Sequence, residues 1–146
     1  MEFKKIHSDI QVVCINDDVV ENLTDTFVRR IKGESLNETD FTSYWDLGKR
    51  PVACDKDSVC GYKGVSVFKH NNNEQEVEAA ILKTLGRNRS FKPILSTIYC
   101  KLKFRSGAGK VWQNGKCQPY HCNFFKEDSF AIAMIDVVEI MRCNNV

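Results

Sequence analysis

The stretch Ile94–Arg105, ILSTIYCKLKFR, alternates along its length between two classes of side chain. One class is mainly apolar, and the other contains Tyr99, Lys101, Lys103 and Arg105. Because successive side chains of a β-strand point to opposite faces, this alternation predicts a strand with one buried face and one basic face. The strand opens a β-rich second half of the chain.

Further strands are expected after it. Ser106–Gly109 is rich in turn residues, and Lys110–Trp112 is expected to start a return strand. Asn114–Gly115 is a strong hairpin signal. The segment Ser129–Met141 is apolar on both faces, which predicts a central strand covered on each side.

The first half favours helices. Gln11–Ile15 is a short β-branched run that predicts a buried strand. In Val19–Ile31 an apolar residue recurs at every fourth position, which predicts an amphipathic helix. A second helix is expected to begin at Asn37 or Thr39 and to end after Leu47.

Residues 49–63 have neither a helical nor a strand period and are expected to form a loop. Gly64–Phe68 predicts a strand, and Glu74–Leu85 predicts a helix with glutamates in its first turns. Since the length fits one domain, the sequence predicts a single α+β domain over residues 1–146. Its antiparallel sheet is joined by two or three helices, mainly from the N-terminal half.

The composition, 42% hydrophobic and 27% charged, excludes collagen, a coiled-coil rod and a disordered tail. No run approaches the roughly 18 apolar residues of a membrane span, so no membrane association is expected. Ser8 and Asp9 stand where a secretory signal would become apolar, which favours a cytoplasmic protein. Seven cysteines, an odd number, then favour reduced thiols.

The charges are strongly segregated along the chain. Residues 79–126 contain ten Lys and Arg residues and no Asp or Glu, whereas the segments on both sides carry net negative charge. Basic residues two apart on a strand lie about 7 Å apart, near the spacing of phosphates in nucleic acid. Aromatic side chains nearby offer stacking surfaces. The expected contacts to an anionic ligand are Arg87, Arg89, Tyr99, Lys101, Lys103, Arg105, Lys110 and Trp112.

A simpler explanation of the segregation is internal neutralisation, in which the acidic first half folds over the basic strand. The basic side chains would then form a solvated edge that deters aggregation.

Zinc is the one cofactor that the sequence suggests, and otherwise none is expected. Cys54 and Cys60, together with Cys117 and Cys122, would hold a tetrahedral zinc if the two pairs met in space. The signal is weak, because only the second pair has the tight spacing of a zinc knuckle.

Candidate acid–base residues are His121, Tyr120 and Glu139. His121 titrates near neutrality, but adjacent strand residues point to opposite faces, so it is not expected to pair with Cys122. By the same parity, Asp136 and Glu139 are expected on opposite faces of their strand, which argues against a paired-carboxylate hydrolase.

These patterns favour a small intracellular binding protein that holds an anionic ligand, a nucleic acid or a nucleotide, on a basic sheet face. One alternative is a small enzyme that acts on a nucleotide or other phosphorylated substrate with a histidine acid or base. The other is a protein-interaction module, of inhibitor or immunity type, with a protein partner.

Overall fold

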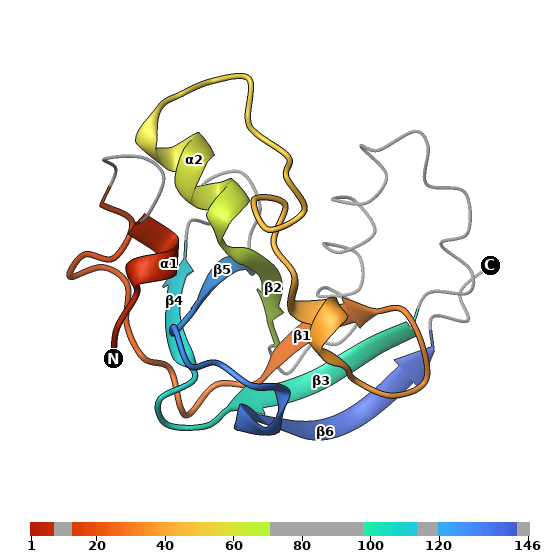
Figure 1. Ribbon diagram of the computed structural model, residues 1–146. Helices are drawn as coiled ribbons and strands as arrows, with labels where there is room; N and C mark the ends of the chain where they lie inside the picture. The colour runs from red at the N-terminus through yellow and green to blue at the C-terminus, as the bar shows by residue number, and fades with distance from the viewer. Residues whose placement is uncertain (8–12, 71–97, 114–119, 143–146) are drawn as a thin grey trace.

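The computed structural model describes residues 1–7, 13–70, 98–113 and 120–142. Six strands in this part of the chain form one antiparallel sheet in the order β4-β5-β2-β1-β3-β6, accompanied by two α-helices and two 3-10 helices (Figure 1). The fold class is α+β, as predicted. The elements are α1 (Lys4–His7), β1 (Phe27–Ile31), η1 (Glu38–Phe41), α2 (Lys56–Lys63), β2 (Val65–Lys69), β3 (Ile98–Phe104), β4 (Gly109–Gln113), β5 (His121–Lys126), η3 (Ile132–Met134) and β6 (Ile135–Arg142).

The sheet is strongly curved (Figure 1). Only residues 105–108 connect β3 to β4, and five residue steps from Phe104 to Gly109 reach at most roughly 18 Å. In a flat sheet, the strand order would place these two strands roughly 19 Å apart. The sheet therefore curls, so that its β4 edge approaches one end of β3.

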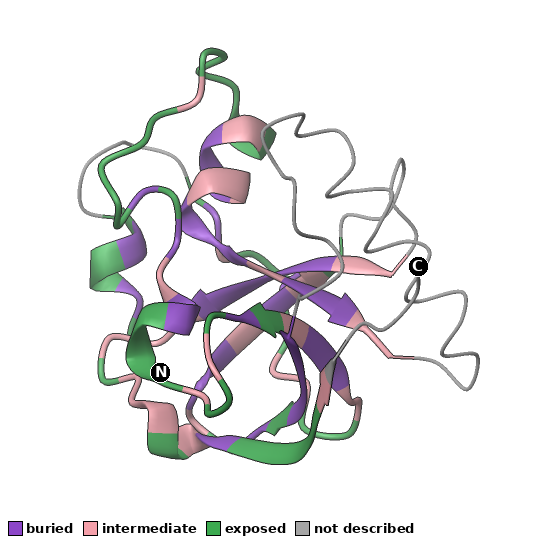
Figure 2. Cartoon of the chain, turned by 90° about the vertical axis from the view of Figure 1, so that its right-hand side faces the viewer, coloured by how far each residue is buried: buried purple, intermediate pink, exposed green. Residues whose placement is uncertain are grey.

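One face of the sheet, the core face, carries the main hydrophobic core. Every strand contributes to this cluster, and Phe41 of η1 packs onto it. Phe104 and Phe124 stack with their ring centroids 4.0 Å apart, and Phe41 meets both rings edge-on. Figure 2 shows that the buried residues concentrate on the strands.

The opposite face, the second face, has its own smaller core near β4 and β5. Phe3 and Ile6 of the N-terminal segment pack there with Phe125 and the partly buried Trp112. A disulfide between Cys14 and Cys60 joins this cluster to α2. The expectation of reduced thiols therefore does not hold for this pair.

The helix predicted over Val19–Ile31 is wrong. Its last five residues, FVRRI, form β1, and Asn22 and Asp25 exchange hydrogen bonds just before that strand. Short polar side chains that bond locally compete with a helix, and the β-branched and aromatic residues that follow favour a strand. A four-residue apolar spacing fits both structures, because residues four apart also share a strand face.

Two other predictions in the first half need correction. The helix expected up to Leu47 is only the short η1, because Ser43 and Asp46 bond each other's backbone and form a turn. The loop expected over residues 49–63 contains α2, whose few buried residues produce no apolar period. For the strand predicted at Gln11–Ile15, residues 11 and 12 lie outside the described residues, and residues 13–15 are not in a strand.

The strands predicted in the second half are mostly confirmed. β2 matches the prediction for Gly64–Phe68 within one residue, and β3 forms within the stretch predicted as a strand, Ile94–Arg105. Its burial does not alternate as expected, because Tyr99 and Lys101 on the basic face are also buried. β4 forms where the return strand was expected, but it pairs with β5 rather than with β3. The predicted helix Glu74–Leu85 and the turn at Asn114–Gly115 lie outside the described residues.

The last strand differs from its prediction. β6 pairs with β3 at an edge of the sheet rather than at its centre, and Val137, Val138 and Ile140 are exposed. No helix among the described residues is both long enough and apolar enough to cross a membrane.

Candidate functional site

The basic face of β3 is paired with carboxylates of β6. Lys101 is buried, and its Nζ lies 3.5 Å from a carboxylate oxygen of Glu139. Arg105 contacts the Asp136 carboxylate at 2.6 Å, which raises the pKa of the arginine and lowers that of the aspartate. Carboxylates of β6 therefore neutralise Lys101 and Arg105, while Lys126 at the end of the basic segment is paired with Asp46 of the first half.

A β-bulge makes this double pairing feasible. Lys101 is opposite Glu139 and Lys103 is opposite Asp136, with Val138 as the extra residue between them. An extra residue reverses the parity of a strand, so both carboxylates lie on the second face. The prediction that Asp136 and Glu139 lie on opposite faces is therefore wrong.

The other predicted ligand contacts are dispersed. Tyr99 is buried, Lys103 is exposed on the same face, and Lys110 lies on β4. Trp112 packs against Phe125 in the second-face core. Arg87 and Arg89 lie outside the described residues.

The predicted zinc ligands do not form a cluster. Cys60 is bonded to Cys14, Cys54 is exposed, and Cys117 lies outside the described residues. Cys122 is buried on the core face, where burial raises the pKa of its thiol to about 11. Among the described residues, no group of three or more His, Cys, Asp or Glu side chains is arranged to hold a metal ion.

Of the three predicted acid–base residues, Glu139 is separated from the other two. Tyr120 and His121 are at the start of β5, whereas Glu139 is on β6, and β2, β1 and β3 lie between these strands. Tyr120 adopts a left-handed backbone, with φ of 74°, and its carbonyl accepts from the Lys69 backbone. His121 lines a cavity to which neither Tyr120 nor Glu139 contributes.

That cavity, the β2–β5 pocket, has a volume of about 440 Å³ and opens on the second face. This volume falls in the range of small-molecule sites. Its lining comes from the loop before α2, from α2 itself, and from β2 and β5: Tyr44, Pro51, Val52, Ala53, Ser58, Gly61, Tyr62, Ser66, His121 and Asn123.

Polar groups of β2 and β5 form one wall of the pocket. His121 Nε2 lies 3.1 Å from Ser66 Oγ, within hydrogen-bond distance. Burial lowers the pKa of His121 below its ordinary value of 6.5, so its imidazole is neutral at pH 7. The pair thus joins a hydroxyl to a neutral histidine at the pocket surface.

Asn123 is directly opposite Ser66 across the two strands. Asn123 is 1% exposed, and its Nδ2 has no hydrogen-bond partner among the described residues. Gly64 permits this close packing, since a Cβ there would lie 2.8 Å from the Cβ of Asn123. A buried amide without a partner costs about 1–3 kcal/mol, so it is a natural place for a ligand atom.

Arg29 fixes the backbone of Ser66. β1 and β2 are paired only at Phe27 and Val28, and beyond these residues the two strands diverge. Arg29 spans the gap, because its Nη1 donates to the Ser66 carbonyl at 2.7 Å and its Nε to the Asp40 carbonyl at 2.9 Å. Burial lowers the pKa of Arg29 to about 10, so it remains charged at neutral pH.

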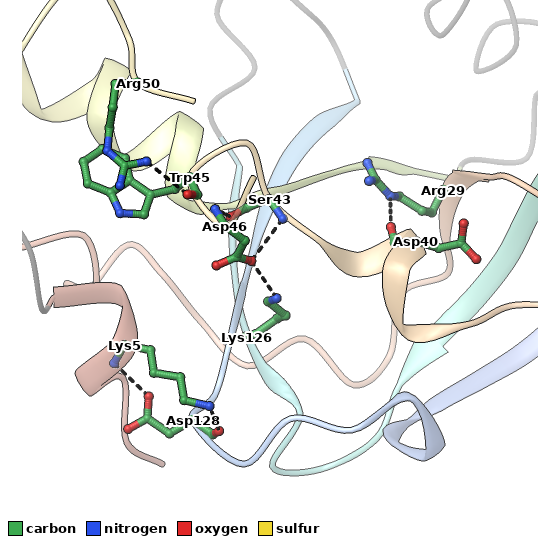
Figure 3. A network of polar contacts seen from close by, with 9 residues as sticks. All are labelled: Lys5, Arg29, Asp40, Ser43, Trp45, Asp46, Arg50, Lys126 and Asp128. Atoms are coloured by element: carbon green, nitrogen blue, oxygen red, sulfur yellow. Dashed lines mark hydrogen bonds and ion pairs between the residues drawn. The ribbon is translucent and has the colours of Figure 1, made fainter. Parts of the chain in front are cut away.

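A network of polar contacts holds the loop that carries Tyr44 (Figure 3). The Asp46 carboxylate accepts from Lys126 Nζ at 2.9 Å and from the Ser43 backbone at 3.1 Å. Burial opposes ionisation of Asp46, but these hydrogen bonds hold its pKa below the ordinary value. Arg50 lies over the Trp45 ring at 3.6 Å and donates to the Trp45 carbonyl.

Two tyrosines form the aromatic side of the pocket. The rings of Tyr44 and Tyr62 lie 5.4 Å apart at an angle of 56°, and Tyr44 is half exposed. Lys49 Nζ lies 5.0 Å from the centre of the Tyr44 ring. The pocket therefore combines aromatic surface with a cation beside one of its walls.

Sequence reasoning found His121 but missed its partners. Ser66 and Asn123 are ordinary strand residues, and only the pairing of β2 with β5 brings them together. A signal did exist for α2, since Asp55 accepts from the Ser58 backbone as a helix cap. That cap would have placed Gly61 and Tyr62 on a helix next to the predicted strand.

The arrangement suits two chemical tasks. A planar ligand would find ring faces and an amide, and a reactive substrate would find a hydroxyl beside a neutral histidine. No protein-family model, curated protein or solved structure matches this chain. Both tasks are therefore inferred from the residues of the pocket.

Proposed function

We propose that the protein binds a small planar ligand with an anionic group, of the nucleoside monophosphate type, in the β2–β5 pocket. The observation that carries this proposal is the buried amide of Asn123, which lines the pocket with no partner for its nitrogen among the described residues. A heterocyclic base offers the acceptor that this amide lacks, since base edges carry ring nitrogens and carbonyl oxygens.

The aromatic and basic residues support the same ligand class. A base stacked on a tyrosine contributes about 1–3 kcal/mol, and Tyr44 and Tyr62 both present ring surface to the pocket. Lys49 would meet the phosphate, because its ammonium group lies next to the Tyr44 ring. The proposal keeps an anionic ligand but moves the site from β3, where Lys101 and Arg105 already have carboxylate partners.

Titration calorimetry with the four nucleoside monophosphates, and with the four nucleosides that lack phosphate, tests this site. We expect at least one monophosphate to bind more tightly than its nucleoside, and Lys49→Ala to abolish that difference. Tyr44→Ala is expected to weaken binding on the order of tenfold, equivalent to about 1.4 kcal/mol.

Two further lysine variants serve as controls. Lys32→Ala removes an exposed lysine outside the pocket and should leave the affinity unchanged. Lys103→Ala removes an exposed lysine of the basic sheet face. Weaker binding by Lys103→Ala with full binding by Lys49→Ala would move the site to that face, and no binding of any monophosphate would refute the proposal.

A further inference from the structure

The polar wall of the β2–β5 pocket has the elements of a nucleophilic site. Ser66 Oγ and His121 Nε2 are 3.1 Å apart, which is the separation expected between a nucleophile and its general base. Asn123 adds an amide donor on the same wall, directly opposite Ser66 in the sheet register. We propose that the protein hydrolyses carboxylic esters, with Ser66 as nucleophile, His121 as general base and Asn123 as donor to the oxyanion. This inference rests on the proposed function, because the ligand pocket is also the substrate pocket.

The acylation step balances without a further reactant. Ser66 Oγ attacks the ester carbonyl carbon while its proton passes to His121 Nε2. The carbonyl oxygen becomes an oxyanion and accepts a hydrogen bond from the Asn123 amide. The intermediate then collapses, the bond to the leaving oxygen breaks, and His121 returns the proton to the departing alcohol.

Water completes the cycle. It attacks the acyl-Ser66 ester and gives a proton to His121, and the carbon–Oγ bond breaks as Ser66 regains that proton. The net reaction converts ester and water into carboxylic acid and alcohol, with no redox change. The opening of the pocket at the surface provides access for water.

Three structural features prepare these groups for the reaction. His121 is neutral at pH 7, which is the form that accepts a proton. Arg29 holds the Ser66 carbonyl, so the backbone beneath the nucleophile is fixed where β1 and β2 diverge. Asn123 is buried and packed against Gly64, so its amide needs little reorganisation as charge develops.

The first test is covalent labelling by a fluorophosphonate probe, followed by intact mass and peptide mapping. Attack by Ser66 forms an Oγ–phosphorus bond, fluoride leaves, and the proton passes to His121. We expect one adduct per chain, located on Ser66. Ser66→Ala should abolish labelling, whereas Ser106→Ala, at an exposed serine outside the pocket, should label like the parent.

Two variants separate catalysis from packing. His121→Gln should slow labelling on the order of 100-fold, the lower range for loss of a general base. Asn123→Asp keeps the side-chain shape but lacks the donor, and should slow p-nitrophenyl acetate hydrolysis by a similar factor. Circular dichroism melting of each variant shows whether it is folded. The rate of ester hydrolysis by the parent should rise with pH as His121 loses its proton, with a pKa below 6.5.

The outcomes separate this inference from the proposed function. Nucleotide binding without an adduct on Ser66 would overturn the hydrolase and leave the binding site. An adduct that forms without any nucleotide binding would support the hydrolase and overturn the nucleotide site. Equal labelling of parent and His121→Gln would also overturn the inference, because it would show a serine that needs no base.

Discussion

Ser66, His121 and Asn123 show how much depends on single side chains in this fold. All three lie on one face of two paired strands, and each is polar where its neighbours are mainly apolar. Gly64 leaves the space that Asn123 occupies. The pocket is therefore sensitive to changes of one or a few atoms.

Protonation of His121 should link stability to pH. Burial lowers its pKa in the folded state, while the unfolded chain keeps a value near 6.5. The stability is therefore fully present above pH 6.5 and is lost as the pH falls below it towards the folded pKa. We expect the urea midpoint of the parent to fall in this range more than that of His121→Gln. His7, whose pKa is lowered chiefly by burial, contributes in the same direction, so the variant should keep part of the dependence.

Adding one methyl group at Gly64 should destabilise the protein by about 1–3 kcal/mol, because it overlaps the Asn123 side chain. Gly61→Ala is the matched control: no atom lies within 4 Å of its added Cβ, and the residue is inside α2. Alanine there should stabilise by about 0.5–1 kcal/mol. Chemical unfolding of both variants measures the difference, and equal effects would contradict the packing described around Asn123.

At the scale of elements, α2 forms one side of the pocket through Ser58, Gly61 and Tyr62. The helix has only eight residues, and so short a helix is not stable on the helix propensity of its residues alone. The contacts at its two ends are therefore important for its stability. Asp55 caps its start, and Gly64 closes its end with a backbone bond to the Cys60 carbonyl. Its placement therefore depends on a cap and on its attachments to neighbouring segments.

Removal of the cap should weaken both the helix and the pocket. Asp55→Ala is expected to reduce the free energy of unfolding and to lower the melting temperature, since the Asp55 carboxylate accepts from the Ser58 backbone and hydroxyl. Asp57→Ala removes an exposed carboxylate of the same first turn and provides the comparison. Thermal melts measure both, and a larger loss for Asp57→Ala would show that Asp55 is not the working cap.

At the scale of the whole molecule, each face of the curled sheet carries a hydrophobic core in the described part of the chain. The Cys14–Cys60 disulfide lies in the smaller core, on the second face. Cys14 and Cys60 are 46 residues apart in sequence, so the bond restricts a long segment of the unfolded chain. Such bonds are typical of proteins in oxidising compartments. The cytoplasmic location stays a prediction.

Reduction should therefore lower the stability of the whole protein. We expect the Cys14→Ser, Cys60→Ser double variant to lose about 2–4 kcal/mol in urea unfolding, and dithiothreitol to destabilise the parent but not this variant. Cys54→Ser, at an exposed free cysteine, should behave like the parent. If dithiothreitol left the parent unchanged, the bond would not contribute to its stability.

The sequence by itself determined the fold class and the strands with strong local patterns. β3 is predictable from the sequence because the residues of its core face are uniformly apolar. β2 is predictable because it is a short run that contains β-branched residues. β1 was misread because residues four apart share a face in both a helix and a strand. α2 was missed because it buries few apolar residues, although its cap was present in the sequence.

Only the tertiary structure decided which residues meet. The pairing of β2 with β5 joins segments more than fifty residues apart, and it creates the contacts of Ser66 with His121 and Asn123. In a regular strand, residues three apart point to opposite faces of the sheet. The bulge at Val138 reverses this alternation, so Asp136 and Glu139 both face the basic side chains of β3. The pattern of apolar and polar residues within a segment indicates which side of that helix or strand is buried. The residues of a site are brought together by the order and register of the strands, and these depend on the packing of the whole sheet.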